Sequence, residues 1–154
     1  MKFTPVVILK LIVLTVTLNL VRYVVIGFVE EIVIFEKLGA AMAASPSYFN
    51  LEFTTADWVT SYLYNFVMWL MLTVFFHKTH PFLRGSMILK SLKVYVPTLV
   101  VFLSISAIFM NHYSHPKDFY LYIMLDAVLV FPLVAVANGL LYPFLVRPEP
   151  GAAS

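Results

Sequence analysis

Residues 119–146 read FYLYIMLDAVLVFPLVAVANGLLYPFLV, a run of 28 residues with a single charged side chain, Asp126. The hydrocarbon core of a bilayer is about 30 Å thick, and a helix needs about 20 apolar residues to cross it. The run is therefore long enough to span a membrane as one helix. A carboxylate at this depth costs roughly 2.5–3.5 kcal/mol on insertion scales, so we expect another polar group to meet Asp126.

The composition extends this interpretation to the whole chain of 154 residues. Hydrophobic residues make up 62% of the sequence and charged residues 12%, with a mean hydropathy of +0.92. A soluble domain carries about 25% charged residues, so this chain cannot cover itself with a water-facing surface. The composition predicts an integral, multi-pass protein of the lipid bilayer. A net charge of +2 gives no reason to expect a nucleic-acid partner, and the lack of cysteine excludes disulfides and thiol chemistry.

Four apolar segments are long enough to be transmembrane helices, and none shows the alternation of a barrel strand. Backbone polar groups in lipid must be bonded within their own segment, which leaves the helix as the only interpretation. The sequence predicts an all-α fold, an antiparallel up-down bundle of four transmembrane helices in one domain, residues 1–146. The expected spans are residues 5–28, 58–76, 87–110 and 119–146, with a continuation of the first helix through Phe35 left open. Residues 147–154 are expected to be a disordered cytoplasmic tail.

The connections between the spans differ in charge. The predicted loop of residues 29–57 carries five acidic residues and one lysine, whereas the segment of residues 77–93 carries four basic residues and no acidic residue. Lys and Arg mark the cytoplasmic side of a membrane protein. We therefore expect both termini to be cytoplasmic, with the 29–57 and 111–118 loops on the outer side.

A rise of 1.5 Å per residue places one polar group from each span at a similar depth in the outer half of the bilayer. These groups are Arg22, Asn65, Ser104 and Asp126, and Asn19 lies one turn from Arg22. We predict a buried ion pair between Arg22 and Asp126, because a guanidinium can hold a carboxylate through two hydrogen bonds. Such a pair could form part of an ion, proton or anion site, or it could only orient two helices. In a further alternative Arg22 snorkels to the headgroups and never meets Asp126.

The four histidines form two pairs with a spacing of three residues. His112 and His115 are expected on the outer side near Glu31, and they are weak candidates for a metal site because zinc binds imidazole and carboxylate ligands. His77 and His80 are interpreted as interfacial side chains in a wet loop at the inner end of the second span. No metal or other cofactor is predicted from these residues.

No complete catalytic set is present in the sequence. There is no Gly-x-Ser-x-Gly nucleophile turn, no His-Glu-x-x-His motif and no glycine-rich phosphate loop. The sequence therefore favours a protein that is not an enzyme, acting as an accessory or interaction subunit of a membrane complex with protein partners or further copies of itself. The alternative is a small oligomeric transporter or channel that uses the Arg22–Asp126 layer.

Overall fold

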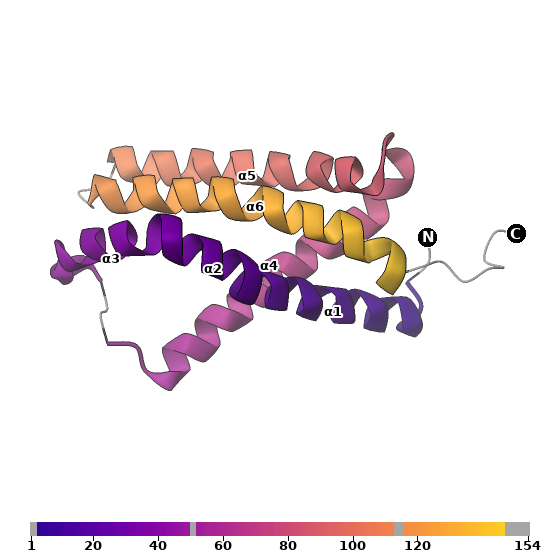
Figure 1. Cartoon of the computed structure of the whole chain (residues 1–154), viewed down its shortest axis with the longest axis horizontal. Helices are drawn as coiled ribbons and strands as arrows, with labels where there is room; N and C mark the ends of the chain where they lie inside the picture. Colours follow the sequence, from indigo (N-terminus) through magenta and orange to yellow (C-terminus); the bar gives the residue numbers. More distant parts are fainter. Residues whose placement is uncertain (1–2, 50–51, 113–115, 147–154) are drawn as a thin grey trace, which may run out of the picture.

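The computed structural model describes residues 3–49, 52–112 and 116–146, and this part of the chain consists of helices joined by short turns (Figure 1). Four of its helical segments are long and apolar enough to cross a membrane. The all-α class and the number of long apolar helices in the described residues are therefore as predicted. The expected disordered tail of residues 147–154 lies outside the described residues.

The first span is much longer than predicted. Instead of ending at residue 28, it continues as one helical segment from Pro5 to Ala43. Thr4 caps its start, because its side chain accepts a hydrogen bond from the Val7 backbone N–H, and Pro5 suits the first helical position. The segment is not a regular α-helix, since two π-helical stretches interrupt it. Its parts are α1 (Pro5–Leu20), η1 (Val21–Ile26), α2 (Gly27–Glu30), η2 (Glu31–Phe35) and α3 (Glu36–Ala43).

The other three spans lie where the sequence places them, and each extends by a few residues. A capping box of Thr54 and Asp57 starts the second span three residues before the predicted boundary. A short turn, η3 (Pro46–Tyr48), precedes it. The remaining elements are α4 (Thr55–Thr79), η4 (His80–Phe82), α5 (Met87–His112) and α6 (Lys117–Leu145).

The helices α5 and α6 form a tight antiparallel pair, which runs along the top of Figure 1. Gly139 permits this packing, because a Cβ atom at its position would lie 2.5 Å from the Ile88 Cα atom. Small residues at a helix interface are the usual means of bringing two backbones close together in lipid. The α5–α6 pair is the most extensive helix contact in the described chain.

The second span, α4, buries side chains along only half of its length. Its buried side chains all come from its C-terminal half and begin at Trp69. The Trp69 indole stacks on the Tyr95 ring and packs at a tilt against the Phe131 ring in the core. The N-terminal half, residues 55–68, contains no buried residue. In Figure 1 this half diverges from α5 and α6, whereas the C-terminal half of α4 approaches them at the Met87 end of α5.

Candidate functional site: a buried polar cluster

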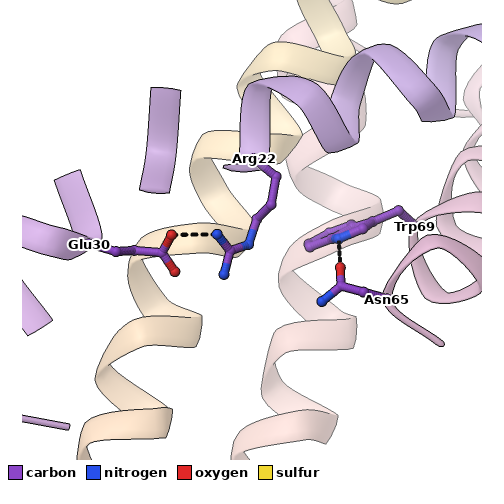
Figure 2. A network of polar contacts seen from close by, with 4 residues as sticks. All are labelled: Arg22, Glu30, Asn65 and Trp69. Atoms are coloured by element: carbon purple, nitrogen blue, oxygen red, sulfur yellow. Dashed lines mark hydrogen bonds and ion pairs between the residues drawn. The ribbon is translucent and has the colours of Figure 1, made fainter. Parts of the chain in front are cut away.

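A buried ion pair joins two residues of the first span, Arg22 and Glu30. Residues eight apart on a regular α-helix point in directions that differ by about 80°. The π-helical turn η1 accommodates one extra residue between them, so the angle between the two side chains around the helix axis is reduced by roughly 100°. Both side chains therefore point to nearly the same face. The backbone shows this wider turn, because the Gly27 N–H donates to the Arg22 carbonyl five residues earlier. Figure 2 shows the Arg22 guanidinium directed at the Glu30 carboxylate.

The Arg22–Glu30 ion pair lies in the interior of the protein. The Glu30 side chain is 0% exposed and that of Arg22 is 13% exposed. Glu30 is predicted in an outer loop from its charge, but it lies inside the longer first span. Arg22 does not snorkel away from the bundle, because its charge is matched by a carboxylate within the protein.

Asp126 of α6 adjoins this pair instead of forming it. Its carboxyl group interacts electrostatically with that of Glu30. The Oε1 atom of Glu30 and the Oδ1 atom of Asp126 are both buried, and neither has a hydrogen-bond partner among the described residues. The cluster therefore links the first span to α6, as expected, but through a carboxyl–carboxyl contact that the sequence did not suggest.

The other residues predicted for the polar layer form hydrogen bonds within their own helices. Asn65 accepts a hydrogen bond of 2.5 Å from the Trp69 indole N–H, one turn further along α4 (Figure 2). Asn19 donates to the Thr15 carbonyl over 2.9 Å. Ser104 is exposed and donates to the carbonyl four residues earlier, so it faces away from the bundle and is not part of the cluster. A serine that bonds to its own backbone needs no interhelical partner.

A second polar cluster lies at the Met87 end, and the sequence interpretation missed it. His77 is 3% exposed and its Nδ1 atom shares a hydrogen bond of 2.5 Å with the Tyr142 hydroxyl of α6. It is therefore a core side chain and not a residue of a wet loop. Nearby, Asn138 of α6 donates to the Ser91 hydroxyl of α5 over 2.9 Å, and both side chains are fully buried. These contacts connect α4 and α5 to α6.

The weak candidates for an outer metal site gain no support from the described residues. His112 and Glu31 are both exposed, and His115 lies outside the described ranges. Within residues 3–49, 52–112 and 116–146, no group of three or more His, Cys, Asp or Glu side chains could hold a metal ion.

A shallow groove of about 370 Å³ lies between the first span and α6. Aliphatic side chains line most of it, and Lys37 and Tyr122 supply the polar groups. Such a surface suits contact with lipid chains. It does not include either polar cluster.

The long apolar helices and the buried polar clusters define the class of this protein as a small polytopic membrane protein. Comparisons with family models, curated proteins and solved structures found no match to the chain.

Proposed function

We propose that this protein is a non-enzymatic accessory or interaction subunit of a membrane complex, and that the N-terminal half of α4 contacts the partner. The observation behind the proposal is the change in environment along one helix. In the C-terminal half, Trp69, Thr73 and His77 follow one another at four-residue spacing, and all three are buried. One and two turns earlier in the same series, Asn65 is half-buried and Ser61 is exposed.

Side chains four residues apart lie on the same side of a helix, so the core-facing side of α4 continues past the point where the helix leaves the bundle. There it presents Trp58 and Tyr62, which are 51% and 48% exposed, to the membrane. Polar side chains on a lipid-facing surface gain more from a protein partner, with which they can hydrogen-bond, than from hydrocarbon. A helix from another subunit would fill this open side.

Site-specific photocrosslinking in the native membrane tests this role. A photoreactive amino acid at Trp58 should give one discrete crosslinked product that also appears in the native complex. The matched control is Met71 on the same helix, which is 67% exposed but lies in the packed half. Equal crosslinking at both positions, or none at Trp58, would contradict the proposal. Differently tagged copies of the chain show whether the partner is a second copy.

The proposed topology has both termini on the cytoplasmic side. The start of α1, the α4–α5 turn and the end of α6 lie at one end of the molecule (Figure 1), and four basic residues cluster around that turn. Because the chain has no cysteine, single cysteines can be introduced without removing any. A cysteine at Ser47 should react with an impermeant maleimide applied outside, and one at Ser86 should not. The reverse pattern would invert the topology.

The second candidate function is a small transporter or channel, favoured by the Arg22, Glu30 and Asp126 cluster. Buried ionisable groups within transmembrane helices often mark substrate or ion paths. In proteoliposomes of the purified chain, Asp126→Asn should then keep the helical content and lose ion or proton flux. If the wild-type chain shows no flux either alone or as an oligomer, this second candidate is rejected.

A further inference from the structure

The cluster around Glu30 has more negative than positive charge. One guanidinium, Arg22, pairs with Glu30, whose carboxyl group also interacts with that of Asp126. The Oε2 atom of Glu30 accepts from Arg22, while Oε1 of Glu30 and Oδ1 of Asp126 have no partner among the described residues. Glu30 is fully enclosed, so bulk water does not reach it.

Two adjacent carboxylates beside one cation would leave a net negative charge in a medium of low dielectric constant. Like charges at this range oppose joint ionisation, and a buried charge without a counterion is strongly unfavourable. The groups from other elements do not correct the imbalance. Besides Arg22 and Asp126, the titratable group that interacts with Glu30 is Tyr23 of η1, which in turn contacts Tyr62 of α4.

We propose that Glu30 and Asp126 form a proton-binding site and hold one proton between them. A single proton cancels the excess charge and supplies the donor that both unpartnered oxygens lack. A shared proton between two neighbouring carboxyl groups is a known arrangement in aspartic proteases. The site belongs to the first span and α6, and it does not depend on the proposed subunit role of α4.

A metal ion is a poorer occupant than a proton. Calcium takes six to eight oxygen ligands and magnesium requires an octahedral shell. The described residues offer no group of three acidic or imidazole side chains that could form such a shell. A proton needs only one donor bond and one acceptor, which the two carboxyl groups provide.

Infrared spectroscopy of the full-length protein in lipid tests the proposal. At neutral pH the wild type should show a carbonyl band of a protonated carboxylic acid that shifts in D₂O. Glu30→Gln and Asp126→Asn should each remove the band, because the one remaining carboxylate is then neutralised by Arg22. The control is Glu31→Gln at the exposed neighbouring position, which should leave the band unchanged.

Two results would overturn the proposal. The first is a wild-type protein with no protonated-acid band at neutral pH. The second is a band that survives in both single variants, which would assign it to another residue. The two variants come from different helices, so if one fails to fold, as judged by circular dichroism, the other still decides the question.

Discussion

The contact between α5 and α6 at Gly139 allows a prediction with a worked magnitude. A Cβ atom at Gly139 would lie 2.5 Å from Cα and 2.8 Å from N of Ile88. Both are backbone atoms, so no side-chain rotation can relieve the overlap. Carbon atoms in contact normally stay about 3.5–4.0 Å apart, so α5 would have to move away by about 1 Å. Such overpacking typically costs about 1–3 kcal/mol, and we expect Gly139→Ala to lower the free energy of unfolding by that amount.

The chain offers a matched control for this substitution. Gly39 in α3 has no heavy atom within 4 Å of the position that a Cβ atom would occupy. Alanine is the better helix former by roughly 0.5–1 kcal/mol, so Gly39→Ala should leave stability unchanged or raise it slightly. Equilibrium unfolding in SDS, followed by circular dichroism, measures both variants. If Gly139→Ala is as stable as Gly39→Ala, the two helices do not meet as closely as described.

Three further predictions concern polar side chains and use the same unfolding assay. Arg22→Met should cost about 3–5 kcal/mol, because it leaves a buried carboxylate unmatched, and the double variant of Arg22→Met with Glu30→Leu should cost clearly less than the sum of the two single variants; additive costs would contradict the ion pair. Tyr142→Phe should cost about 1–3 kcal/mol, since it removes the hydroxyl bound to the buried His77 imidazole; a neutral effect would show that the hydrogen bond is absent. Ser104→Ala should stay within about 0.5 kcal/mol of wild type, and a larger loss would place this hydroxyl in a contact between helices.

The sequence was sufficient for the class and for the positions of the spans. Apolar runs of about 20 residues have few alternatives in lipid, because an unpaired backbone is too costly there. The end of the first span was missed because Glu30 and Glu31 marked a loop by their charge. The helix continues through them because Glu30 is neutralised by Arg22, while Glu31 is exposed. Regular helical spacing gave no hint of that pair, since a π-helical turn aligns the two side chains.

The buried position of His77 in the second polar cluster could have been predicted from the sequence. Trp69, Thr73 and His77 are spaced four residues apart, which indicates a single helix face. Because His77 and His80 lie at the inner end of the predicted span, both were interpreted as interfacial residues of a wet loop. The partner of His77, Tyr142, could not be predicted. Which residues of α4 and α6 meet depends on the crossing angle of the two helices, and the residue pattern of one helix alone does not give that angle.

The last helix, α6, makes a polar contact with each of the other three spans. Asp126 meets the first span, Asn138 meets α5 and Tyr142 meets α4. Polar contacts are directional, so they fix the rotation of each helix in lipid, where apolar packing alone discriminates weakly. The contact to α4 lies at the Met87 end, and among the described residues no hydrogen bond or ion pair joins residues 55–68 to another helix. A partner that packs against this half of α4 can therefore displace it about His77 without breaking any polar contact within the bundle.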